Sequence, residues 1–314
     1  MKRAYHRFLP GLIVLSLLAF VQQPSRAEQA AAAPNAEKEK FLRFVEDDDG
    51  GGRLEAAIVT YENDKGARVH LVSAVHVGER KYFTDLAKTF EGYDALLYEM
   101  VKPRDAAVPG PGVQSDSMVS TFQRLLKDLL ELEFQLDAID YRAKNFVHAD
   151  LTAEEFVQLQ EERGESILSL MLRAMMAEMQ KPQQAPEISL PELLVAFTSP
   201  DRARHFKMIL GRQFEDMEQK VAGLEGPNGS VLVTERNKAA IRILKETVAK
   251  GKKNVGLFYG AAHMPDLSKR LAEAGFKPVK TEWRVAWDMT AREGDVIVKT
   301  VKKKQPEPQP QPAN

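Results

Sequence analysis

The sequence predicts an α/β fold (α+β) with a mixed central sheet, built from two related β-α-β units with a helical insertion between them. The main observation is a repeated pattern: an apolar strand, a turn of small residues, a histidine, a helix, a glycine and a strand carrying a glutamate. The first copy leads from His76 to Glu99 and the second from His263 to Glu282. Such repetition at a fixed order is typical of a duplicated supersecondary unit.

The N-terminal segment predicts a secretory signal peptide, residues 1–27. Lys2, Arg3 and Arg7 precede an apolar run over 8–21, and small residues around Ala27 suit cleavage. The run is shorter than the about 20 residues of a membrane span. We therefore expect an exported protein, periplasmic or secreted. The alternative is an uncleaved N-terminus that associates the protein with the envelope or a membrane.

Charge and cysteine content exclude several classes of protein. Removal of residues 1–27 takes away four basic residues and no acidic one, so the formal charge changes from −1 to −5. This acidic balance argues against a nucleic-acid partner. The chain has no cysteine, which excludes thiol nucleophiles and thiolate-ligated metals.

Residues 28–53 are expected to form a flexible linker, because 28–37 are rich in alanine and polar residues. The acidic run 46–49 and the three glycines after it lack the spaced ligands of a calcium loop, which favours a solvated loop. The domain should then span 54–288. For residues 289–314 we expect a strand remnant and a disordered proline-rich tail.

The first unit begins with a predicted hairpin. Strand-like runs at 54–61 and 67–75 are joined through a polar turn that ends at Gly66, and the second run delivers His76. His70 shares the strand parity of His76 but lies near the start of its run, so we interpret it as a sheet residue. A helix over 82–90 and a strand over 94–100 follow, and the proline-rich loop 102–112 comes after Glu99.

The helical insertion is expected at about 115–222. Apolar residues at helical spacing predict a helix over 117–141, Thr152 and Glu155 fit a capping box, and a methionine-rich stretch covers 167–179. His148 and Asp150 precede the capping box. They have either a packing and capping role or a direct role in the site.

The second unit is preceded by a predicted helix over 231–250 that ends at Gly251. Arg236 and Asn237 lie near its start, and as neighbours they point about 100° apart. A helix over 267–274 and a strand over 278–285 complete the unit.

Two imidazoles and a carboxylate at strand ends suit a divalent metal with open positions for water. His76, Glu99 and His263 would be the ligands, with Glu282 as a possible fourth ligand or as a group that orients another. Buried histidines at strand ends are also common as hydrogen-bonded core residues, so the spacing alone leaves both readings open.

The same residues resemble the TraB/PrgY/GumN family, over about residues 54–288. The resemblance is carried by Gly260-Ala-Ala-His263, the earlier Ser73-Ala-Val-His76, Tyr98-Glu99, Glu235-Arg236-Asn237 and Gly275-Phe276. The family is related to the TIKI metalloproteases and more distantly to erythromycin esterases and haem-binding ChaN proteins. Its hallmarks are two Gly-x-x-His motifs, and Ser73 stands where the first motif normally has glycine.

The resemblance implies His76, Glu99 and His263 as site residues that hold Mn²⁺, Co²⁺ or Zn²⁺. It further implies that Arg236 and Asn237 bind the substrate or stabilise an oxyanion. We therefore expect an exported metal-dependent hydrolase that acts on a peptide or amide bond, or a variant in which His76 alone activates water. The alternative is a non-catalytic envelope protein that binds a peptide, a lipid or haem at the same place.

Overall fold

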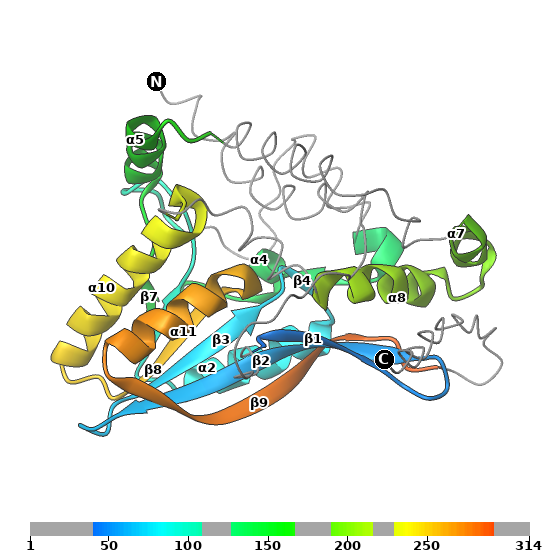
Figure 1. The fold of residues 1–314 in the computed structure, drawn as a ribbon, viewed down its shortest axis with the longest axis horizontal. Helices are drawn as coiled ribbons and strands as arrows, with labels where there is room; N and C mark the ends of the chain where they lie inside the picture. Colours follow the sequence, from blue (N-terminus) through cyan, green and yellow to red (C-terminus); the bar gives the residue numbers. More distant parts are fainter. Residues whose placement is uncertain (1–39, 109–126, 167–189, 216–228, 292–314) are drawn as a thin grey trace, which may run out of the picture.

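The computed structural model describes residues 40–108, 127–166, 190–215 and 229–291, and within them a seven-stranded mixed sheet forms the centre of the protein (Figure 1). Helices pack on both faces of this sheet, so the predicted α/β class is confirmed. The strands of the sheet are β1 (Leu42–Glu46), β2 (Gly52–Asn63), β3 (Arg68–Ala74), β5 (Ala95–Tyr98), β7 (Phe146–His148), β8 (Asn254–Gly260) and β9 (Phe276–Asp288). A second, two-stranded sheet pairs β4 (Val77–Gly78) with β6 (Glu133–Phe134).

The predicted hairpin is confirmed as the antiparallel pair β2 and β3. Its turn is closed by Asn63, whose side-chain oxygen accepts from the amides of Lys65 and Ala67, while Gly66 takes a φ of 73°. Glycine adopts this left-handed conformation without the strain of a β-carbon. β1 and β3 pair with successive halves of β2, and β9 pairs antiparallel along nearly the whole of β2.

Four neighbouring strands are parallel and lie in the order β3, β8, β5, β7. The first β-α-β unit runs from β3 through α2 (Arg80–Glu91) to β5, and the second from β8 through α11 (Met264–Glu273) to β9. β8 therefore lies between the two parallel strands of the first unit. As a result, the two units interleave and bring the ends of β3 and β8 side by side.

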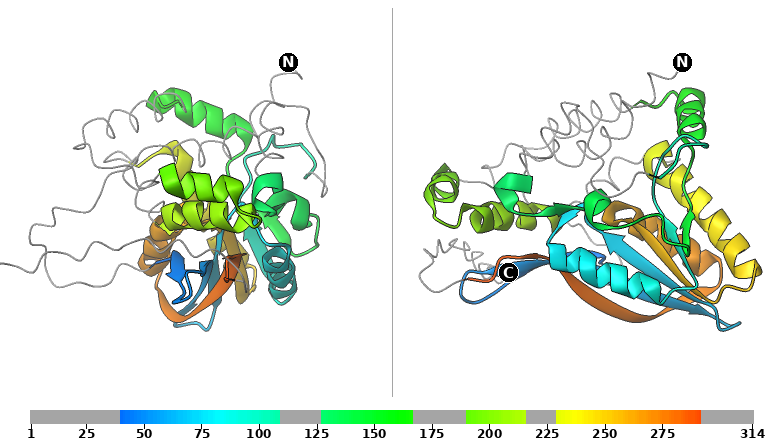
Figure 2. Two further views of the ribbon diagram at one scale, coloured as in Figure 1. Left: turned by 90° about the vertical axis from the view of Figure 1, so that its right-hand side faces the viewer. Right: turned by 180° about the vertical axis from the view of Figure 1, so that it is seen from behind.

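The two crossover helices pack on opposite faces of the sheet (Figure 2). α2 packs with even-numbered strand residues such as Val72 and Leu96, whereas α11 and α10 (Arg236–Ala249) pack with odd-numbered ones such as Leu71 and Leu97. The crossovers run in opposite directions across the sheet, so connections of one hand place their helices on opposite sides. Both faces of the parallel strands are thus covered, as parallel sheets require.

The other helices in the described ranges lie around this centre. The capping box predicted at Thr152 is present, with Thr152 and Glu155 each accepting from the other's backbone amide. These elements are α4 (Gln135–Ala138), α5 (Ala153–Arg163), α7 (Leu190–Thr198), α8 (Arg202–Glu215), a π-helix η2 (Val231–Glu235) and a 3-10 helix η3 (Ala261–His263). α8 packs against β1, β2 and β9.

Two predictions for the insertion at 115–222 were wrong in the part that the structure describes. Within the described residues, the helix predicted over 117–141 is present at 127–130 and ends at Glu131, whose φ is 52°. The chain then forms β6 and α4, with Gln135 donating its backbone amide to the carbonyl of His76. The insertion is also not wholly helical, since β7 extends the central sheet. Three residues are too few for a period-two pattern to be recognised.

The linker predicted at 28–53 was wrong for its last part. Leu42–Glu46 form β1, which pairs antiparallel with β2, and β2 itself begins at Gly52. Phe41 and Leu42 are 0% and 1% exposed, so burial of these two side chains favours an ordered strand. The acidic run starts at Glu46, the last residue of β1, and the rest of it lies in a turn in which the Gly50 amide donates to the Asp47 carbonyl.

Several predicted segments lie outside the described residues: the signal peptide 1–27, the start of the linker, the methionine-rich stretch 167–179 and the proline-rich tail. Among the described residues, none of the helices has both the length and the apolar character needed to cross a membrane.

The packing of β8 against β5 and against Tyr93, which lies between α2 and β5, predicts a size limit at Gly256. A β-carbon there would stand 2.5 Å from the ring of Tyr93 and 2.6 Å from Leu96. Gly256→Ala should therefore lower the free energy of unfolding by about 1–3 kcal/mol, measured by chemical denaturation. Gly92→Ala is the control, because its β-carbon would meet nothing closer than 3.4 Å and its φ is −81°. Equal effects of the two substitutions would contradict this packing.

Candidate functional site

Each of the four parallel strands is followed by a polar side chain at its carboxyl end. His76 follows β3, His263 follows β8, Glu99 follows β5 and Asp150 follows β7. Ligands of open α/β sheets bind outside these strand ends. The predicted residues His76, Glu99 and His263 are therefore brought together by three adjacent strands, and the insertion adds a fourth.

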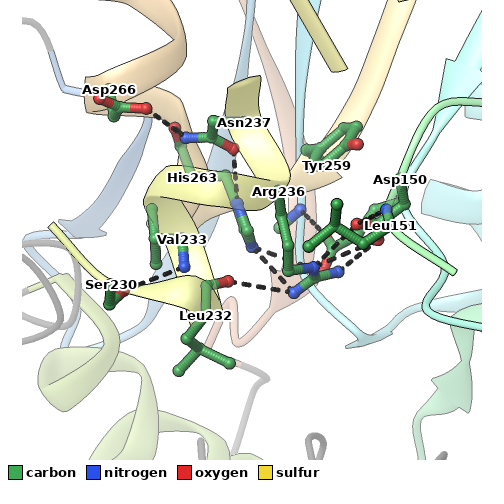
Figure 3. Close-up of polar contacts among 12 residues, drawn as sticks. Asp150, Leu151, Ser230, Leu232, Val233, Arg236, Asn237, Tyr259, His263 and Asp266 are labelled. Carbon is green, nitrogen blue, oxygen red and sulfur yellow. Dashed lines mark hydrogen bonds and ion pairs between the residues drawn. The ribbon is translucent and has the colours of Figure 1, made fainter. Parts of the chain in front are cut away.

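The Arg236 guanidinium lies at the centre of these polar contacts (Figure 3). Its side chain is 2% exposed. Its Nη2 donates to Glu99 Oε1 and to Asp150 Oδ2, each at 2.6 Å, and its Nε donates to Asp150 Oδ1 at 3.0 Å. Nη1 lies 3.4 Å from both the carbonyl oxygen of Leu232 and Nε2 of His263. All three guanidinium nitrogens thus have partners within the protein.

The local backbone explains how Arg236 reaches this position. The preceding turn is a π-helix, in which the amide of Glu235 donates to the carbonyl of Ser230. The wider π turn leaves the Leu232 carbonyl oriented toward the guanidinium, and π-turns are frequent at functional sites. The Ser230 side chain caps the turn by accepting from the amide of Val233.

The charges in this cluster stabilise each other. Burial by itself raises the pKa of Glu99, but the Arg236 guanidinium and then His263 outweigh burial and hold the pKa well below its ordinary value. Burial likewise lowers the pKa of Arg236, and the carboxylates of Asp150 and Glu99 reverse this and raise it. Two carboxylates and one guanidinium give the cluster a net charge of −1.

His263 is held in a defined orientation by Asn237, whose side chain is fully buried. Asn237 donates its amide hydrogens to the His263 carbonyl at 3.1 Å and to Asp266 Oδ2 at 2.8 Å. Its Oδ1 therefore faces Nδ1 of His263, 2.7 Å away, and accepts a hydrogen bond from Nδ1–H. Nδ1 of His263 thus carries a hydrogen, and Nε2 is directed toward Arg236 and toward Glu99 Oε1, which lies 3.5 Å away.

His76 and Glu99 converge over Gly260. A β-carbon on Gly260 would be 3.4 Å from both Nε2 of His76 and Oε2 of Glu99. The Gly260 amide donates to that same Glu99 oxygen at 2.7 Å. Burial lowers the pKa of His76, and His263 and Arg236 add to the effect, while Glu99 and Gln135 oppose it. At neutral pH the ring is therefore neutral and available as a base.

Arg236 and Asn237 lie in the site, but not in the role that we expected. Every hydrogen-bond donor of Asn237 and every nitrogen of Arg236 is already paired with a protein acceptor. Both side chains are almost completely buried. The geometry therefore assigns them to positioning Glu99 and His263, because neither has a free donor for a substrate oxyanion.

Other candidate residues lie outside the cluster. Glu282 forms ion pairs with Lys280 and Arg284 on its own strand β9, which is separated from β3 by β2. His70 is a sheet residue as predicted, bonded to Thr60 and Asn254. His148 is bonded through Nε2 to the Met100 carbonyl and packs against Tyr98.

Asp150 is a member of the cluster that our predicted site set lacked. Its side chain is completely buried, and besides Arg236 it accepts from the amide of Leu151 at 2.8 Å. The sequence does hold a signal for Asp150. The short run Phe146-Val-His148, the small Ala149 and then Asp150 follow the order of strand, small residue and polar residue that also leads to His76 and His263. Only the pairing of β7 with β5 identifies that run as a strand.

The donors do not fit the predicted His/His/Glu metal centre in this arrangement. The Arg236 cation lies 2.6 Å from Glu99 Oε1 and 3.4 Å from His263 Nε2, where it would repel a divalent ion. Within the described ranges no group of three or more histidine, aspartate or glutamate side chains is arranged to hold a metal. Metal binding stays a prediction.

Comparisons with protein-family models, with curated proteins and with solved structures find no match to this chain. The resemblance to the TraB/PrgY/GumN family accordingly stays a hypothesis based on the motifs.

The buried ion cluster predicts a large stability effect at Asp150. Asp150→Asn removes one of the two charges that compensate Arg236, so the free energy of unfolding should fall by about 3–5 kcal/mol. The measurement is chemical or thermal denaturation. As the control, Glu246→Gln removes a carboxylate from the exposed pair with Arg242 (N–O 3.2 Å) and should change stability by less than about 0.5 kcal/mol. Similar losses in both variants would contradict the role of Asp150.

The depressed pKa of Glu99 predicts how stability depends on pH. A carboxyl whose folded pKa lies below its unfolded value, about 4.3, stabilises the fold fully above that value and loses this contribution as pH falls toward the folded pKa. The stability advantage of wild type over Glu99→Gln should therefore shrink between about pH 5 and pH 3. Denaturant titrations of both proteins across this window measure it. A constant difference would mean that Glu99 is not ionised in the fold.

Proposed function

We propose that the protein is an exported hydrolase of amide or peptide bonds, in which His76 activates water beside Glu99. The observation that carries this proposal is the convergence of His76 Nε2 and Glu99 Oε2 over Gly260, at the carboxyl ends of adjacent parallel strands. The lowered pKa of His76 supports its role as a neutral base. Export and membership of the TraB/PrgY/GumN family are parts of the same proposal, based on the N-terminal segment and the paired histidine motifs.

The proposed reaction needs no group beyond water and the substrate. Nε2 of His76 takes a proton from water while the oxygen forms a bond to the carbonyl carbon. The carbon–nitrogen bond then breaks, and the leaving amine takes the proton from His76. The products are a carboxylic acid and an amine. The carboxylate of Glu99 stabilises the imidazolium that exists between the two proton transfers.

Stabilisation of the developing oxyanion falls to backbone amides in this proposal. Gly260 leads into η3, which continues without interruption as α11. The first amides of a helix lack intrahelical acceptors and lie at the positive end of its dipole. They suit this role better than Arg236 and Asn237, whose donors are already paired.

A peptide library analysed by mass spectrometry tests the activity. Wild type should release new carboxyl termini, and His76→Ala and Glu99→Gln should each lower kcat by about 10²- to 10⁴-fold. His70→Gln is the matched control, because His70 lies on β3, the strand that leads to His76, but is bonded to Thr60 and Asn254 outside the site. Saturable binding of a peptide, lipid or haem without any mass change would instead support the non-catalytic alternative.

A second variant tests the site without removal of a polar group. Gly260→Ala should fold normally, since its φ is −55° and its β-carbon meets nothing closer than 3.4 Å. The methyl group would lie between His76 and Glu99, so hydrolysis should fall by at least about 100-fold.

In the proposed mechanism, hydrolysis should survive treatment with a metal chelator. Stoichiometric metal in wild type, lost together with activity on chelation or in a His76→Ala/His263→Ala variant, would support the metal-dependent mechanism instead.

A further inference from the structure

The two site histidines are each backed by a carboxamide side chain. For His263 this is Asn237, whose Oδ1 accepts the Nδ1 proton at 2.7 Å and so fixes the tautomer of the ring. For His76 the neighbouring carboxamide is Gln135, the first residue of α4. No motif singled out in the sequence includes Gln135, because the helix predicted over 117–141 placed it on a continuous α-helix.

Gln135 is anchored at three of its four polar groups, one of which is its backbone carbonyl, the acceptor for the amide of Ile139 at 3.0 Å. Its backbone amide donates to the His76 carbonyl at 2.9 Å, which ties α4 directly to the turn after β3. Its side-chain Nε2 donates to the hydroxyl of Tyr141 at 2.6 Å. The remaining atom, Oε1, is buried and completes no hydrogen bond, in a side chain that is only 7% exposed. A buried amide oxygen without a partner costs about 1–3 kcal/mol.

His76 offers one ring nitrogen that can satisfy this oxygen. Its Nε2 faces Gly260 and Glu99 Oε2, as the contacts of the missing β-carbon show. Nδ1 is thus the nitrogen left for a partner on the other side of the ring. The side chain of Gln135 already interacts with the imidazole. An Nδ1–H donor and the unpaired Oε1 acceptor are complementary groups on two residues that the Gln135 backbone amide already ties together.

We infer that Gln135 is a positioning residue whose Oε1 accepts a hydrogen bond from Nδ1–H of His76. The Nε2 lone pair of His76 is then directed at Gly260 and Glu99. The role of this lone pair as a base rests on the proposed function, whereas the position of the proton on Nδ1 does not. His76 and His263 then share one arrangement, with a carboxamide oxygen on Nδ1 and with Nε2 directed into the site. A carboxamide fixes the tautomer without the charge that a carboxylate would add to a cluster of net charge −1.

The opposite orientation of the Gln135 amide makes the opposite prediction. With Oε1 on the Tyr141 hydroxyl and Nε2 toward His76, the ring would have to accept at Nδ1 and carry its proton on Nε2. That proton would face Glu99, and His76 could not take a proton from water. The tautomer of His76 therefore decides between the two orientations.

Nitrogen-15 NMR of the histidine rings in the full chain measures the tautomer directly. At about pH 8, above the ordinary imidazole pKa, His76 and His263 should both give the pattern of the Nδ1–H form. Loss of its signals in His76→Asn assigns the first ring. In Gln135→Met, which keeps the length of the side chain but removes Oε1, His76 should leave that pattern while His263 retains it and reports an intact site.

Gln135→Glu keeps an acceptor oxygen and should preserve the Nδ1–H pattern, so the inference stays testable if the methionine variant does not fold. An Nε2–H pattern for His76 in wild type, or an unchanged Nδ1–H pattern in Gln135→Met, would overturn it. If no hydrolysis is found but His76 carries its proton on Nδ1, the proposed function fails and the inference stands. Where hydrolysis is measurable, Gln135→Met should lower kcat by about 10-fold or more with KM unchanged.

Discussion

The site depends on one buried interaction, the guanidinium of Arg236 held between Asp150 and Glu99. Each of these charges would be strongly unfavourable alone in a nearly dry environment, and each is stabilised only by the others. Because Asp150 follows β7, Glu99 follows β5 and Arg236 begins α10, the cluster also connects three separate parts of the chain. The same buried charges therefore fix both the geometry of the site and the way in which β5, β7 and α10 pack together.

The interleaving of the two β-α-β units gives this cluster its chemistry. Insertion of β8 between β3 and β5 places His76, His263 and Glu99 at adjacent strand ends. The Gly260 amide bonds the Glu99 carboxylate, and Glu99 Oε2 and His76 Nε2 both border the space that a β-carbon on Gly260 would fill. Arg236 then neutralises part of the negative charge that would attract a metal ion. This balance of charges favours a neutral imidazole acting beside a carboxylate over a His/His/Glu metal centre.

The predictions that were wrong share a physical cause, namely that local patterns carry no information on partners far along the chain. Apolar spacing over 117–141 suited a helix, yet Glu131 turns the chain and Gln135 bonds to His76 instead. Phe41 and Leu42 lie within the segment 28–53 that we predicted as a linker, but both are buried once β1 pairs with β2. In each case the long-range contact outweighs the local preference.

The sequence by itself determined the α/β class, the hairpin, the capping box at Thr152 and the repeated strand-histidine units. These features depend on turn chemistry and periodicity within short windows of the chain. The repeated order of strand, histidine, helix and strand also singled out His76, Glu99 and His263, which the structure places at the ends of adjacent strands. Only the tertiary structure decided that β7 adds Asp150, that Arg236 and Asn237 are already paired within the protein, and that Glu282 lies away from the site. Strand order and the pairing of buried charges are set by contacts between distant segments, and a sequence pattern does not encode them locally.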